Sequence, residues 1–133
     1  MSSRLRKVHF ISGFITVIVF LFTGFYMQRQ FPDIYLPNEI IRMQFRANHV
    51  YILLAGLHNI GLGSYLAASR KKRGPKLQAI GSISIFVATT LLIIAFFKEP
   101  IQASPDKPIT TIAMLSLLLG TILHAVGSSR EQA

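Results

Sequence analysis

Four long apolar runs, separated by polar and proline-containing segments, dominate the pattern of the chain. They cover about residues 8–27, 48–68, 77–97 and 109–126, and none of them contains Asp, Glu, Lys or Arg. At ~1.5 Å per helical residue, each run is long enough to cross a hydrocarbon core about 30 Å thick. We therefore predict an all-α integral membrane protein of one domain over residues 1–133, with four transmembrane helices in an up-down bundle.

The longest connection, between the first and second runs, has a pattern of its own. Pro32 and Pro37 disfavour helix at the residues before them, and Asn38 is a suitable N-cap for a helix that begins at Glu39. From Glu39 to the second run, apolar and charged residues recur with helical spacing. This pattern predicts a short amphipathic helix near the membrane interface that leads into the second span.

The basic residues predict the orientation. The N-terminal tail, the segment RKKRGPK over residues 70–76 and the C-terminal tail hold more Lys and Arg than the two other connections. By the positive-inside rule both termini are expected in the cytoplasm, in a bacterial inner (plasma) membrane. The first run follows a basic tail without an A-x-A cleavage site, so we interpret it as a retained membrane anchor. Gly74-Pro75 is predicted as a turn, and Gly127 as the C-cap of the last helix.

Composition narrows the chemistry that the chain can perform. Hydrophobic residues make up 51% and charged residues 14%, which is untypical of a soluble domain. The absence of cysteine excludes disulfides, thiolate nucleophiles and Cys-based metal sites. The net charge of +9 is explained by topology, so nucleic acid is not expected as a partner. The five acidic residues lie outside the four runs, which argues against a proton-relay pump or a carboxylate-bridged metal site.

The segment RMQFRANHVYILLAGLHNIGLGSY, residues 42–65, is the one around which the rest is expected to be organised. Two heptad rows run along it: Arg42, His49, Gly56 and Gly63 form one, and Tyr51, His58 and Tyr65 form the other. At about 100° per residue, His49 and His58 point to roughly opposite sides. The glycines of the first row predict close packing against another helix.

The histidines are the candidate cofactor ligands, because histidine within a span usually faces the bundle interior. His9 and His124 lie near the cytoplasmic ends of the first and fourth helices, with Gly13 and Gly120 on the same faces. Two such imidazoles can hold haem b between them, and small neighbours would leave room for the macrocycle. His58, which is deeper, is an alternative partner or part of a quinone site. The structural alternative for His9 and His124 is a place in the headgroup layer or a hydrogen bond to a neighbouring carbonyl, and for His58 it is hydrogen bonding between helices.

Arg42, Arg46 and His49 form a second candidate site on the outer side. Guanidinium groups bind phosphate and carboxylate in a bidentate manner, so a lipid headgroup, a haem propionate or a quinone head would suit this cluster. The alternative is that the two arginines anchor the helix at the interface.

In layout and in its histidine-bearing spans, the chain resembles small four-helix di-haem cytochromes of the b type. That resemblance implies haem and electron transfer, but the four histidines do not form two pairs matched in depth, and we assign no family. Three hypotheses stand: a non-catalytic accessory or assembly subunit, a haem b or quinone electron-transfer protein, and a binder or transporter of anionic lipid or another small molecule. Membrane lipids are the expected partners, with a homo-oligomer or a larger membrane complex as further options.

Overall fold

The computed structural model describes residues 2–32, 37–65, 74–104 and 106–128. These residues form four α-helices and one short 3₁₀-helix, and no strand occurs among them. The elements are α1 (Ser2–Gln30), α2 (Glu39–Tyr65), α3 (Gly74–Lys98), η2 (Pro100–Gln102) and α4 (Pro108–Ser128). The predicted all-α class is confirmed for this part of the chain.

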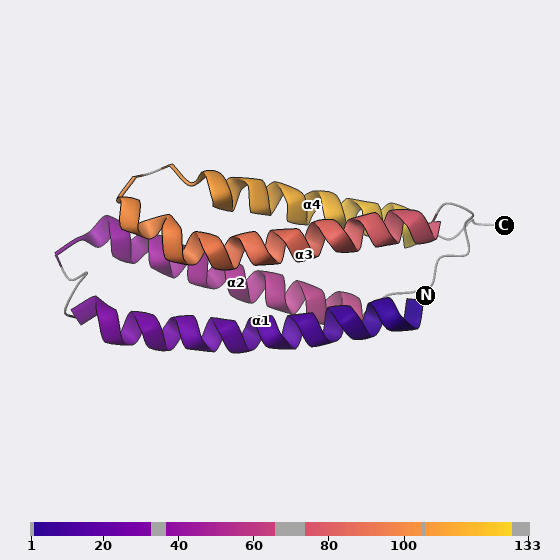
Figure 1. Cartoon of the computed structure of the whole chain (residues 1–133), viewed down its shortest axis with the longest axis horizontal. Helices are drawn as coiled ribbons and strands as arrows, with labels where there is room; N and C mark the ends of the chain where they lie inside the picture. Colours follow the sequence, from indigo (N-terminus) through magenta and orange to yellow (C-terminus); the bar gives the residue numbers. More distant parts are fainter. Residues whose placement is uncertain (1, 33–36, 66–73, 105, 129–133) are drawn as a thin grey trace.

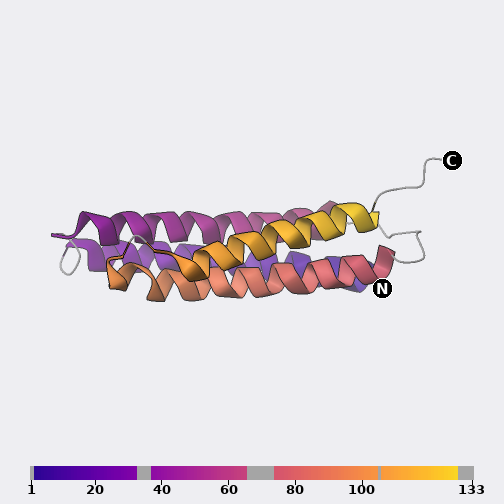
Figure 2. The same ribbon diagram turned by 90° about the horizontal axis from the view of Figure 1, so that it is seen from above.

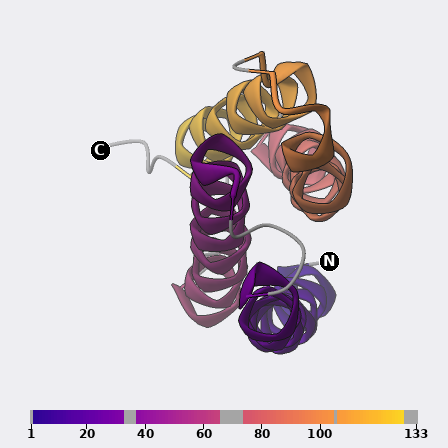
Figure 3. The ribbon, with the colours of Figure 1, turned by 90° about the vertical axis from the view of Figure 1, so that its left-hand side faces the viewer.

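The four helices lie side by side along one long axis, and consecutive helices run in opposite directions (Figures 1 and 2). They pack as two close pairs, α1 with α2 and α3 with α4 (Figure 3). Contacts of α2 with α3, and fewer of α1 with α3, join the pairs. The start of α1 and the end of α4 therefore lie at the same end of the bundle.

Three helical stretches are long and apolar enough to cross a membrane: Arg4–Gln30, Gly74–Gln102 and Pro108–Ser128. The stretch that contains α2 is not among them, although we predicted four spans. Only the described residues were searched, and the last residues of the predicted second span, 66–68, are not among them. By length and composition, three of the four predicted spans are supported.

The outside of the bundle is apolar on every helix. Large hydrophobic side chains are exposed along α1, α3 and α4, and also on α2 at Ile40, Met43, Val50, Leu54 and Leu57. A soluble monomer rarely exposes apolar surface on this scale. The surface of α2 thus resembles that of its neighbours, and its polarity is directed inward.

The start of α2 agrees with the sequence. The Asn38 side-chain oxygen accepts a hydrogen bond from the Ile41 N–H at 3.1 Å, which confirms Asn38 as the N-cap. The predicted amphipathic lead-in and the predicted second span are one uninterrupted helix. The last predicted residues of that span, 66–68, lie outside the described residues.

Two predictions about helix ends are wrong. Gly74-Pro75 is not a turn: α3 begins at Gly74, and Pro75 lies in its first turn, where a missing N–H has no helical acceptor. Gly127 is not a C-cap, because α4 continues to Ser128 and no described glycine has a positive φ. Gly127 is buried instead, and a Cβ on it would lie 3.1 Å from the Gly74 carbonyl oxygen.

Glycines allow the two helices of each pair to approach at backbone distance. A Cβ on Gly63 would lie 2.5 Å from the Phe10 nitrogen, and one on Gly13 would lie 2.7 Å from the Gly56 carbonyl oxygen. In the other pair, a Cβ on Gly120 would lie 2.7 Å from the Gly81 carbonyl oxygen. The prediction that Gly56 and Gly63 pack against another helix is confirmed, and that helix is α1. Such small-residue contacts are typical of helix pairs in membranes.

Gly63→Ala should destabilise the protein by about 1–3 kcal/mol, because the new methyl group overlaps the α1 backbone. Gly61→Ala is the matched control, since a Cβ there meets nothing within 4 Å. It should be neutral or stabilise by up to about 1 kcal/mol through helix propensity. Unfolding of the detergent-solubilised protein measures both. Equal effects of the two variants would contradict close packing of α1 on α2 at this point.

Candidate functional site

His9 and His124 meet in the interior of the bundle. Their ring centroids are 5.4 Å apart in an edge-to-face arrangement, and the residues are 0% and 3% exposed. Ser82 of α3 lies between them, with its Oγ 2.9 Å from the Nε2 atom of each ring. The two histidines are thus brought together as the sequence suggested, by a serine that the sequence analysis had not singled out.

Asn59 of α2 completes the arrangement. Its Oδ1 lies 2.8 Å from His9 Nδ1, and its Nδ2 donates to the Ala55 carbonyl and to Thr89 Oγ1, at 2.9 and 3.1 Å. Each of the four helices therefore contributes one side chain, and all four residues are buried. We call His9, Asn59, Ser82 and His124 the histidine node.

The hydrogen-bond partners of the node restrict where its protons lie. A buried imidazolium is costly, and no carboxylate is among the described contacts of either ring, so we take both rings as neutral. Because the Asn59 carbonyl oxygen only accepts, His9 carries its proton on Nδ1 and accepts at Nε2. The Ser82 hydroxyl then donates to His9 Nε2 and accepts from the Nε2–H of His124.

The hydrogen bonds of the node therefore form a chain in which each residue donates to the next, from His124 through Ser82 and His9 to Asn59. The Ser82 hydroxyl also lies 2.8 Å from the Gln78 carbonyl, which competes for its single proton. At the opposite end, His124 Nδ1 is buried without a hydrogen-bond partner. A chain of this kind is satisfied internally except at that one nitrogen, and it ties all four helices together.

The node is too tightly packed to hold haem between its two imidazoles. Both Nε2 atoms are engaged by Ser82, and the Phe86 ring stacks on His9 with centroids 4.6 Å apart. Gly13 and Gly120, which we expected to leave room for a macrocycle, are in contact with neighbouring helices. Haem ligation by this pair would require both rings to leave Ser82 and the helices to separate.

His58 makes no described hydrogen bond to the node and instead contacts α4. Its Nε2 is 3.1 Å from Thr121 Oγ1, whose hydroxyl donates to the Leu117 carbonyl at 2.8 Å. The His58 nitrogen is therefore the donor of the first of these bonds. This contact is the interhelical hydrogen bond that we had considered as the structural alternative to a cofactor role.

Arg42, Arg46 and His49 each have different surroundings. His49 is hydrogen-bonded to Thr23 of α1 at 2.8 Å and stacks on Phe20, with centroids 4.0 Å apart. Arg46 is exposed and lies 5.8 Å from the Phe31 ring centroid, whereas Arg42 Nε is buried without a hydrogen-bond partner. None of the described contacts joins His49 to either arginine, so their role in binding an anion stays a prediction.

Glu99 lies in a connection, as predicted from the sequence, namely the turn between α3 and η2 at the other end of the bundle, but its burial was not predicted. Glu99 is 1% exposed, and its side chain accepts the Thr110 N–H at 2.9 Å and also the Thr110 hydroxyl. It thus provides a negative charge and an acceptor at the start of α4. Burial lowers the pKa of nearby Lys107, and the Glu99 charge partly offsets that effect.

A row of buried amides on α2 was also missed. Asn48 Nδ2 donates to the Ala95 carbonyl at 3.1 Å, and Gln44 Nε2 donates to the Ser104 carbonyl. Together with Asn59 they lie on the buried side of α2 at spacings of one and three helical turns. The spacing of these three amides is visible in the sequence, but only the rows of histidines, glycines and tyrosines on other faces of the helix were considered in the sequence analysis.

The described residues contain no group of three or more His, Cys, Asp or Glu side chains that could hold a metal ion. No family model, curated protein or solved structure matches the chain. The assignment of a function therefore depends on the geometry of the helices and of the histidine node.

Proposed function

We propose that the chain is a four-span protein of the plasma membrane, with bacterial inner membrane as the expected location and both termini in the cytoplasm. In this proposal it is a non-catalytic component, an accessory or assembly subunit, and its buried histidines have a structural role. The observation that carries the proposal is the distribution of polar and apolar side chains, which is the reverse of that in a soluble bundle. Polar side chains are bonded to one another inside, and apolar side chains cover the outside.

The same observation supports α2 as a fourth span. Its 27 residues reach about 40 Å at ~1.5 Å per residue, which exceeds the hydrocarbon thickness. The side chains of Asn48, His49, His58 and Asn59 are hydrogen-bonded to α1, α3 or α4, so these groups need no water at membrane depth. The exposed residues of α2 are apolar, apart from the charged side chains near its start and Ser64 and Tyr65 at its end.

The chemistry of the interior supports a non-catalytic role. The imidazoles of His9, His49 and His58 are each hydrogen-bonded to a side chain of another helix, and the Glu99 carboxylate binds the start of α4. A general base or a nucleophile must contact a substrate, whereas these groups are hydrogen-bonded to other helices of the bundle. The apolar outer faces are suited to lipid or to the helices of a partner protein.

Because the chain has no cysteine, single introduced cysteines report topology without background labelling. Pro37→Cys and Tyr65→Cys place a thiol just before α2 and at its exposed end, where Tyr65 is 89% accessible. If α2 spans the membrane, an impermeant maleimide added to intact cells should label residue 37. Residue 65 should react only after permeabilisation. Labelling of both from one side would show that α2 lies on the membrane surface and would contradict the four-span topology.

An absorption spectrum tests the structural role of the histidines against the haem hypothesis. The protein purified in detergent after haem-replete expression should show no Soret band, because both Nε2 atoms of the His9–His124 pair are engaged by Ser82. A Soret band that persists through purification, and that is lost in both His9→Ala and His124→Ala, would establish haem ligation by this pair. That result would overturn the structural assignment.

A further inference from the structure

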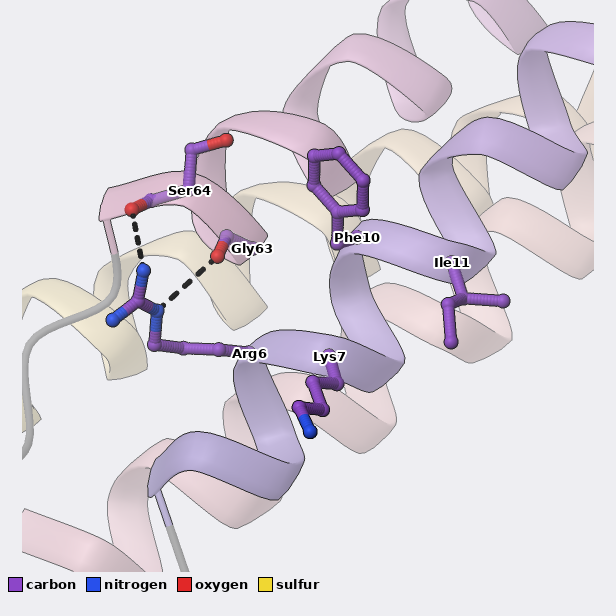
Figure 4. Close-up of a pocket in the computed structure, with 6 residues that line it drawn as sticks. All are labelled: Arg6, Lys7, Phe10, Ile11, Gly63 and Ser64. Atoms are coloured by element: carbon purple, nitrogen blue, oxygen red, sulfur yellow. Dashed lines mark hydrogen bonds between the residues drawn. The ribbon is translucent and has the colours of Figure 1, made fainter.

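A cavity of about 470 Å³ lies where the start of α1 meets the end of α2 (Figure 4). Its size is within the range of small-molecule sites. The residues that line it are Arg6, Lys7, Phe10, Ile11, Gly63 and Ser64. Cationic side chains thus border one part of the cavity, and an aromatic and an aliphatic side chain border another.

The two cations differ in what they already bind. Arg6 donates from Nε to the Gly63 carbonyl at 3.3 Å and from Nη2 to the Ser64 carbonyl at 3.0 Å, so it caps the C-terminal end of α2. The Lys7 ammonium has no hydrogen bond or ion pair with the described residues. It is the cation of this cavity that remains available to an anionic ligand.

The cavity lies where the residues of α1 change from charged to uncharged. Arg6 and Lys7 are followed by the uncharged run of residues 8–27, so the cations lie at the level expected of lipid headgroups. This is the end of the bundle that the positive-inside rule assigns to the cytoplasm, and the cytoplasmic leaflet is the one with a negative surface potential.

A second cavity adjoins the first at Ile11. Ile11 lines this cavity of about 470 Å³ between α1 and α3, together with Val8, Ile15, Phe86 and Ile93. Ser12, Thr16, Thr89 and Thr90 also contribute to its walls. Ile11 therefore lies between the cationic cavity and a groove whose exposed surface is mainly apolar.

We propose that these two cavities form a binding site for an anionic phospholipid of the cytoplasmic leaflet. Its headgroup phosphate lies against Lys7 and the outer edge of Arg6, and an acyl chain follows Ile11 into the groove between α1 and α3. Charge complementarity and the shared wall of the two cavities at Ile11 identify the occupant, since neither a free anion nor an uncharged lipid would use both parts. The site rests on the proposed membrane orientation, but lipid binding in detergent is measured independently of that orientation.

Native mass spectrometry of the full chain in detergent tests this site, with phosphatidylglycerol and phosphatidylcholine as the probes. Phosphatidylglycerol should bind more tightly, and Lys7→Gln should weaken it about 5-fold, which corresponds to roughly 1 kcal/mol per basic residue near the surface. Lys76→Gln is the matched control, because Lys76 is an exposed lysine at the same end of the bundle and outside the cavity. It should change binding by less than about 2-fold.

Three results would overturn the proposal. Equal binding of the two lipids would show that the cations do not contribute. Equal weakening by Lys7→Gln and Lys76→Gln would indicate diffuse attraction to the basic end of the bundle. Displacement of the lipid by glycerol phosphate at the same concentration would identify a site for a free phosphate ester and would exclude the groove from the binding.

Discussion

The need of buried polar groups for partners inside the bundle is the constraint on which this structure depends, and among the described side chains only Arg42 Nε, Gln44 Oε1 and His124 Nδ1 are buried without one. In a membrane no water is available at mid-depth, and an unpaired donor or acceptor is costly. The Ser82 hydroxyl meets that requirement for two imidazoles at once, at 2.9 Å from each. With Asn59 on the far side of His9, the node fixes the position of all four helices at one level.

Two kinds of contact hold the helices together. Glycines bring the partners within each pair to backbone distance, as at Gly13 with Gly56 and at Gly81 with Gly120. Polar side chains then join one pair to the other, because His9 and Asn59 belong to one pair and Ser82 and His124 to the other. Lipid tails are as apolar as leucine, so these directional contacts determine which bundle forms.

The sequence predicted the features that leave a recognisable pattern of residue types along the chain. Apolar runs located the four helices, Asn38 located the start of α2, and heptad spacing identified the glycine face. It did not identify Ser82, because a single serine in an apolar run carries no pattern. It did not predict that Glu99, in the turn after α3, is buried, because the burial of a residue at a helix end is decided by where the next helix returns. The membrane topology and the role of each histidine stay predictions for experiment.

The unfolding free energy of Ser82→Ala tests the central claim most directly. We expect a loss of about 2 kcal/mol, because the Nε2 atoms of His9 and His124 both lose their partner in a dry interior. Ser64→Ala is the control, since the Ser64 hydroxyl is exposed and returns to the Ile60 carbonyl of its own helix. It should change stability by less than about 0.5 kcal/mol. If Ser82→Ala is as stable as Ser64→Ala, the histidine node does not hold the four helices together.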